Sequence, residues 1–177
     1  MEKNLKNIKL IVLDVDGTLT DGKIYYGAEG EIMKAFNVKD GFAISDTRKM
    51  IKYAIITGLA TQIVDHRAKR LGIDIVYQGI ENKYKILKEI MENHNLKKEE
   101  VAYIGDGIND LSVLPLVHYF GAPKNSNCEV LDYADFVSDY DGGSGAVYQF
   151  VKKILIEQGL DRKSTRLTPV TWPSRMP

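Results

Sequence analysis

The chain has 177 residues, of which 44% are hydrophobic and 27% are charged, a composition that excludes a disordered or fibrous protein and suits one domain with one core. Its 24 basic residues balance its 24 acidic ones, so the total charge gives no sign of binding to nucleic acid or a membrane surface. The single cysteine excludes an internal disulfide, the first residues show no signal pattern, and no uncharged run is long enough to span a membrane. From these three observations we expect a soluble cytoplasmic protein.

The composition changes near residue 161. Residues 161–177 hold the only tryptophan, three of the five prolines, and four basic residues against one acidic. The remaining chain has 20 basic and 23 acidic residues, a net charge of −3. We therefore expect one domain over residues 1–160 and an irregular or disordered tail over 161–177. We hypothesise that this tail is a non-native extension.

Strands and helices are expected to alternate along the first 160 residues. The apolar segment 8–13 predicts a strand buried on both faces, and a β-hairpin is expected over 22–38 with its turn at 27–30. Further strands are expected at 53–56, 74–77, 101–104, 117–120 and 134–137, and helices at about 41–50, 60–71, 81–94, 108–114 (stopped at Pro115), 126–131 and after 143. This alternation predicts an α/β fold, with a parallel sheet between two layers of helices.

Polar residues follow four of these predicted strands at their carboxyl ends, where open α/β sheets bind ligands: Asp14 with Asp16, Thr57, Lys83, and Asp106 with Asp110. Carboxylates so close together repel, and a hard divalent cation such as Mg²⁺ would offset that repulsion. A helix cap or an acidic turn is the alternative for Asp14 with Asp16, and N-capping of a helix by Asp106 or Asn109 is the alternative for the second pair. An EF-hand loop fails on spacing, because Gly17 is fourth and Tyr25 twelfth from Asp14.

Helical spacing separates Lys83 from the other lysines of its segment. Residues 83, 86, 87 and 90 share one face with the apolar positions, whereas Lys85 and Lys88 lie on the opposite face. Lys83 therefore points at the sheet and needs an anionic partner. For Thr57, an ordinary turn residue is an equally good interpretation.

Together these residue types suit phosphoryl transfer. Mg²⁺, Lys83, the Thr57 hydroxyl and the backbone N–H groups near Gly17 would surround the phosphoryl oxygens. One carboxylate would attack phosphorus and form an aspartyl phosphate, and a second would serve as general acid and then as general base.

The pattern resembles the haloacid dehalogenase superfamily of phosphatases, through Asp14-Val15-Asp16-Gly17-Thr18, Thr57-Gly58, Lys83 and the segment Gly105 to Asp110. The resemblance implies a Rossmann-like, doubly wound sheet, with Asp14 as the nucleophile and Asp16 as the acid–base. It also implies that Asp14, Asp106 and the main-chain carbonyl of Asp16 bind Mg²⁺, with Asp110 supporting from close by. Only about 25 residues separate Thr57 from Lys83, so no cap domain fits and the hairpin is the only insertion.

Segments 30–41, 71–73, 77–79 and 142–147 are similar to the 3-deoxy-D-manno-octulosonate 8-phosphate phosphatases. This implies a role in lipopolysaccharide biosynthesis and a homotetramer in which the hairpin helps to close the adjacent site. Lys34, Arg67 and Lys39 are then candidate substrate contacts, with Gly17, Thr57 and Gly58 at the phosphate; the alternative for the three cations is a solvated surface position.

Two positions differ from that family, because Leu59 and Tyr148 stand where it tends to show arginine. Both differences remove cations that could contact an acidic sugar. A phosphatase for a sialic-acid-type 9-phosphate or another small phosphate ester is therefore the alternative substrate assignment. A non-catalytic relative that binds a metal or a partner is the alternative from another class.

Overall fold

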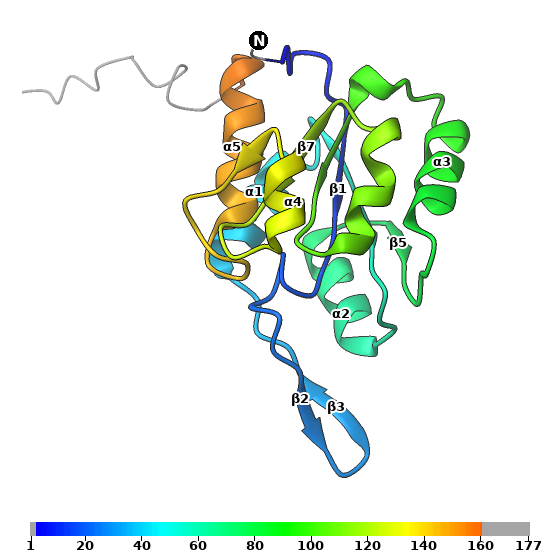
Figure 1. Cartoon of the computed structure of the whole chain (residues 1–177), viewed down its shortest axis with the longest axis vertical. Helices are drawn as coiled ribbons and strands as arrows, with labels where there is room; N and C mark the ends of the chain where they lie inside the picture. Colours follow the sequence, from blue (N-terminus) through cyan, green and yellow to red (C-terminus); the bar gives the residue numbers. More distant parts are fainter. Residues whose placement is uncertain (1–2, 161–177) are drawn as a thin grey trace, which may run out of the picture.

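The computed structural model describes residues 3–160, and the expected tail over 161–177 lies outside them. A six-stranded parallel sheet with the order β5-β4-β1-β6-β7-β8 forms the centre of the molecule (Figure 1). The strands are β1 (Leu10–Leu13), β4 (Lys52–Ile56), β5 (Ile75–Tyr77), β6 (Val101–Ile104), β7 (Tyr119–Ala122) and β8 (Phe136–Val137). The hairpin of β2 (Tyr25–Gly27) and β3 (Gly30–Met33) is a separate antiparallel sheet.

Helices cover both faces of the sheet, as the alternation of elements predicted. One core cluster joins the sheet to α1 (Val38–Thr47), α2 (Gln62–Leu71) and α5 (Ala146–Glu157). The other joins it to α3 (Lys83–Asn93), α4 (Cys128–Tyr133) and the 3₁₀ helix η2 (Ile108–Leu116); a short 3₁₀ turn, η1 (Lys98–Glu100), precedes β6. Alternate residues of β1 enter the two clusters, as the period of a strand requires. None of the described helices combines the length and the apolar character needed to cross a membrane.

The order of the strands brings three of them together at one sheet edge. From β1 the chain moves outward to β4 and β5, and then crosses to β6 on the other side of β1. Both neighbours pair with β1 in parallel register, so the carboxyl ends of β4, β1 and β6 lie side by side. This is the switch point at which α/β sheets place their ligand sites.

Several expected boundaries are wrong, among them two helices: the one expected at 41–50 lies at 38–47, and the one expected at 126–131 lies at 128–133. The second hairpin strand ends at Met33 instead of Val38, because Asn37 caps α1: its side-chain oxygen accepts a hydrogen bond from the Lys39 amide at 2.7 Å. The short helix expected at 108–114 is a 3₁₀ helix, and it does not stop at Pro115 but continues to Leu116. The strand expected at 117–120 lies at 119–122.

The hairpin projects away from the body of the molecule, below the carboxyl edge of the sheet in the view of Figure 1. Several of its side chains are apolar and exposed: Tyr26 is 70% exposed, Ile32 65% and Met33 49%. Exposed apolar surface of this kind is typical of an interaction site.

Candidate active site

Three carboxylates meet at the switch point. Oxygen atoms of Asp14, Asp106 and Asp110 all lie within 4.8 Å of one another. Asp14 directly follows β1, whereas the other two follow β6, so the parallel pairing of these strands creates the cluster. The cluster offers only oxygen ligands, which are the donors that Mg²⁺ prefers.

The pKa values of Asp14 and Asp106 also favour a bound cation. Burial, and next the charge of Asp110, raise the pKa of Asp14 well above its usual range, although Lys83 opposes them. Burial and Asp110 also raise the pKa of Asp106 to about 6. Because the protein itself leaves these carboxyls short of positive charge, the donor set fits a bound divalent cation.

Lys83 lies inside the cluster. Its side chain is 1% exposed, and its Nζ donates to Asp14 Oδ1 at 2.7 Å and to Asp110 Oδ1 at 2.6 Å. The helical spacing predicted that Lys83 points at the sheet and has an anionic partner, and both expectations are confirmed. Lys85, on the opposite face of α3, is exposed.

Two glycines allow the loops of the site to approach each other. Gly17 has a φ of +87°, and a Cβ at this position would lie 2.1 Å from Asp106 Oδ2. A Cβ on Gly142 would lie 1.7 Å from the Gly17 carbonyl oxygen. The segment around Gly142 therefore packs directly against the loop that carries Asp14 and Asp16.

Thr57 and Gly58 come to the same edge of the sheet. Thr57 is 1% exposed and directly follows β4, which pairs with β1. Its amide donates to the Tyr77 carbonyl, and its own carbonyl accepts from the Ile80 amide, both at 3.0 Å. These bonds fix the Thr57 backbone beside the end of β1.

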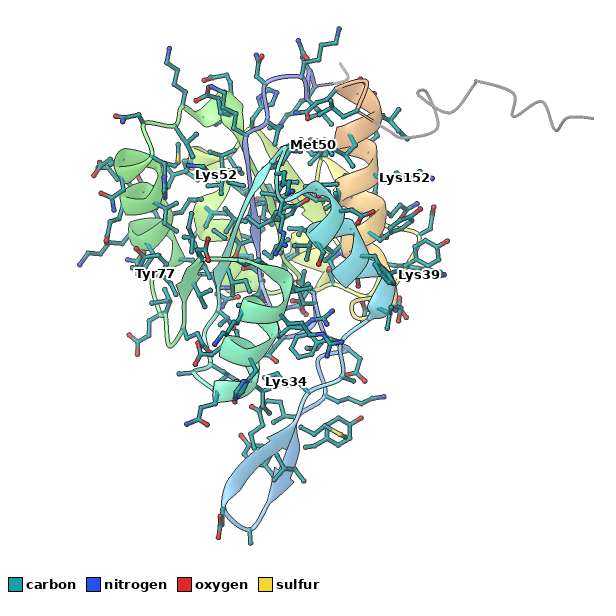
Figure 2. The ribbon with its side chains drawn as sticks, turned by 180° about the vertical axis from the view of Figure 1, so that it is seen from behind. Lys34, Lys39, Met50, Lys52, Tyr77 and Lys152 are labelled. Atoms are coloured by element: carbon teal, nitrogen blue, oxygen red, sulfur yellow. The ribbon has the colours of Figure 1, made fainter. Side chains whose placement is uncertain are left out.

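Of the three cations predicted to contact the substrate, Lys39 is exposed, whereas Lys34 and Arg67 are not solvated surface cations. Lys34 is 6% exposed, lies where the hairpin meets the body (Figure 2), and donates to Asp16 Oδ1 at 2.5 Å. Arg67 donates to the Asn37 carbonyl at 3.0 Å, and its guanidinium lies 5.0 Å from the centre of the Phe36 ring. Lys34 thus joins the site through Asp16, whereas Arg67 braces the base of the hairpin.

Tyr103 is a member of the site that the sequence interpretation missed. It is fully buried in β6, stacks on Phe120 at a centroid distance of 5.7 Å, and its hydroxyl donates to Asp110 Oδ1 at 2.5 Å. Asp110 also accepts from the Gly107 amide at 2.9 Å through Oδ2. The available signal was a hydroxyl-bearing residue in an otherwise aliphatic strand, two positions before Gly105.

Comparison with known proteins places the chain beside a group of phosphatases. The model of the haloacid dehalogenase-like hydrolases matches residues 29–151. The chain is 40% identical over 155 residues to the 3-deoxy-D-manno-octulosonate 8-phosphate phosphatase of Escherichia coli K12, covering 87% of this chain and 82% of that protein.

Solved structures of such phosphatases superpose closely. The Moraxella catarrhalis enzyme, solved in complex with magnesium, phosphate and a KDO molecule, gives a TM-score of 0.87 at 35% identity, over 92% of this chain and 94% of that chain. The cobalt-bound form from Haemophilus influenzae gives 0.87 at 33% identity, over 94% and 96%.

Proposed function

Because the chain belongs to the haloacid dehalogenase-like hydrolases, we propose that it is a Mg²⁺-dependent phosphatase of 3-deoxy-D-manno-octulosonate 8-phosphate. The relatives that share 40% of its sequence carry this activity in their names, and a neighbouring structure holds magnesium, phosphate and the sugar acid. The observation that carries the chemistry is the buried Asp14–Lys83–Asp110 cluster at the carboxyl edge of the sheet.

In the proposed reaction Asp14 is the nucleophile. Its carboxylate attacks phosphorus to form an aspartyl phosphate, while Asp16 protonates the departing sugar oxygen. Asp16 then takes a proton from the water that hydrolyses the intermediate. Lys83 and Thr57 neutralise or hydrogen-bond the phosphoryl oxygens, and the loop at Gly17 offers backbone N–H groups.

Mg²⁺, when bound, supplies positive charge to the carboxylates and to the phosphoryl oxygens. Asp14, Asp106 and the main-chain carbonyl of Asp16 would hold it. Both oxygens of Asp110 already accept hydrogen bonds, from Lys83 and Tyr103 on Oδ1 and from Gly107 on Oδ2. We therefore assign Asp110 the supporting place in the metal site.

The sugar end of the substrate is read by groups near the hairpin, with Lys34 and Arg67 as the proposed contacts, whereas Gly58 is a proposed contact of the phosphate beside Thr57. Leu59 and Tyr148 are partly exposed, at 41% and 37%, and neither can supply a cation. A sialic-acid-type 9-phosphate remains the second candidate because of these two positions.

The proposal extends to assembly and location. Residues 1–160 would form one catalytic domain, working in the cytoplasm in lipopolysaccharide biosynthesis. The exposed apolar residues of the hairpin, Tyr26, Ile32 and Met33, would be covered in a homotetramer in which each hairpin helps to exclude water from an adjacent site.

A panel of phosphate esters, assayed with purified protein with and without Mg²⁺, tests this function. We expect phosphate release only with the metal, with the octulosonate 8-phosphate as the best substrate and Asp14→Asn inactive. If no ester released phosphate, the proposed phosphatase function would be refuted. Preference for a sialic-acid-type 9-phosphate or a neutral sugar phosphate would refute the proposed substrate assignment.

A further inference from the structure

The two carboxylate oxygens of Asp16 are in different situations. Oδ1 accepts a hydrogen bond from Lys34 Nζ at 2.5 Å. Within residues 3–160, Oδ2 accepts no hydrogen bond from another residue, and the side chain is 21% exposed. One oxygen is therefore anchored by the protein, and the other is free to meet a ligand.

Lys34 is held firmly enough to serve as that anchor. Its side chain is fully buried, and its Nζ also lies 3.2 Å from Glu31 Oε1. Burial by itself would lower the pKa of Lys34, but the hydrogen bonds and charges of Asp16 and Glu31 outweigh burial and raise it. A buried ammonium between two carboxylates loses much of the motion of an ordinary surface lysine, because leaving either partner would leave a charge unpaired.

The position of Lys34 in the chain makes this contact informative. It directly follows β3, at the base of a hairpin whose tip points away from the sheet. Asp16 is 18 residues earlier, in the loop after β1. The ion pair thus connects an element outside the core to the carboxylate that borders the nucleophile Asp14.

We propose that Lys34 is a positioning residue for proton transfer, holding Asp16 by Oδ1 so that Oδ2 is presented to the ester oxygen. The inference rests on the proposed phosphatase function. In the first step an Asp14 oxygen bonds to phosphorus, the phosphorus–oxygen bond of the ester breaks, and its electron pair stays on the sugar oxygen, which takes the proton from Asp16. In the second step water attacks phosphorus, gives its proton to Asp16, and the bond between phosphorus and Asp14 breaks.

A purely structural ion pair predicts a different behaviour. If Lys34 only secured the hairpin, its loss would affect all substrates alike. If it orients Asp16, the loss depends on how much the leaving group needs a proton. A sugar alkoxide is a strong base and needs protonation, whereas 4-nitrophenolate is a weak base and departs without it.

The test compares kcat/KM for a simple alkyl phosphate, which has no sugar for Lys34 to contact, with kcat/KM for 4-nitrophenyl phosphate, in the full chain with Mg²⁺. For Lys34→Met we expect the alkyl ester to lose at least about tenfold more than the nitrophenyl ester, a part of the 10²–10⁴ that acid–base catalysis contributes. Lys34→Arg keeps a cation near Asp16 and should recover most of the loss on the alkyl ester.

Lys23→Met is the charge-matched control, because it removes a lysine from the start of the hairpin whose side chain is 72% exposed. This variant should leave the ratio of the two esters unchanged. An equal loss for both esters in Lys34→Met, no loss, or the same selective loss in Lys23→Met would overturn the proposal. If Lys34→Met does not fold, as judged by circular dichroism, Lys34→Gln takes its place: a greater loss on the alkyl ester than on the nitrophenyl ester supports the proposal, and an equal loss on both esters refutes it.

Hydrolysis of 4-nitrophenyl phosphate by the parent protein, and its loss in Asp14→Asn, tests the phosphatase function separately. If the parent is active and the Lys34 variant loses activity equally on both esters, only the proposed role of Lys34 is refuted. An inactive parent would refute the function on which that role rests.

Discussion

Two buried lysines, Lys83 and Lys34, each lie between two carboxylates, but they belong to different parts of the molecule. Lys83 stands on a helix packed in the core and bonds Asp14 and Asp110, 69 and 27 residues away. Lys34 stands at the base of the projecting hairpin and bonds Asp16 and Glu31, which are much closer in sequence. In the proposed mechanism the two lysines have different tasks: Lys83 assists the formation of the bond to phosphorus, and Lys34 positions the carboxylate that transfers the proton.

Loss of Lys83 should have the largest effect. Lys83→Met removes a cation from the nucleophile and from the phosphoryl oxygens, so kcat/KM should fall about 10³-fold, as for removal of a key transition-state donor. The loss should be equal for alkyl and nitrophenyl esters, in contrast to Lys34→Met. Lys85→Met, on the exposed face of the same helix, is the matched control. Activity within tenfold of the parent would contradict the role of Lys83.

The second carboxylate of each lysine sharpens the comparison. Asp110 is fully buried and accepts three hydrogen bonds, so Asp110→Asn should lower kcat/KM about 10²-fold for every ester, because Lys83 loses a charged partner. Glu31→Gln should cost less than about threefold, since Lys34 keeps its shorter bond to Asp16. Steady-state kinetics of both variants check this, and equal losses would show that the two clusters are equivalent.

Tyr103 gives the Lys83 cluster a support that we find nowhere around Lys34 in the described chain. Tyr103→Phe removes the hydrogen bond to Asp110 but preserves the stacking on Phe120. We expect kcat/KM to fall about tenfold and the free energy of unfolding to fall by about 1.5–3 kcal/mol, the usual scale for one hydrogen bond to a charged group. Urea unfolding and kinetics measure the two effects; full activity would limit Tyr103 to packing.

Asp40 is a buried carboxylate that forms no ion pair with a lysine among the described residues, so it shows how burial acts on a carboxylate without such a partner. Burial raises its pKa to about 6, against the opposing amides of Tyr148 and Gly145 and the charge of Arg67, and its Oδ2 has no hydrogen-bond partner. Because the folded protein holds this proton more tightly than the unfolded chain, stability should fall as the pH rises from about 4 to about 6, by on the order of 2–3 kcal/mol.

Asp40→Asn should remove that part of the slope, since an amide oxygen can still accept from the Tyr148 amide and has no charge to lose. Urea unfolding of parent and variant across this pH range isolates the contribution of Asp40 from that of the active-site aspartates. Parallel stability curves for the two proteins would contradict the raised pKa.

The sequence predicts the surroundings of Lys83 better than those of Lys34. Lys83 could be assigned because its helical face is shared with Ile86, Leu87 and Ile90, and because a buried lysine needs an anion. Lys34 could not be assigned in this way: residues 34–37 belong to neither strand nor helix, so no periodicity indicates where the side chain points. Tyr103 was passed over because a tyrosine in a buried strand is usually a packing residue.

The sequence by itself determined the sheet, its two helical layers and the aspartates at the ends of β1 and β6, because apolar periodicity and strand-end chemistry are local properties. It also determined which face of α3 carries the buried lysine. Tertiary structure alone decided that Lys34 bonds Asp16 and that Tyr103 and Gly107 hold Asp110. These contacts depend on how a hairpin and two loops pack in space, and distances across such packing are not encoded in the spacing of residues along the chain.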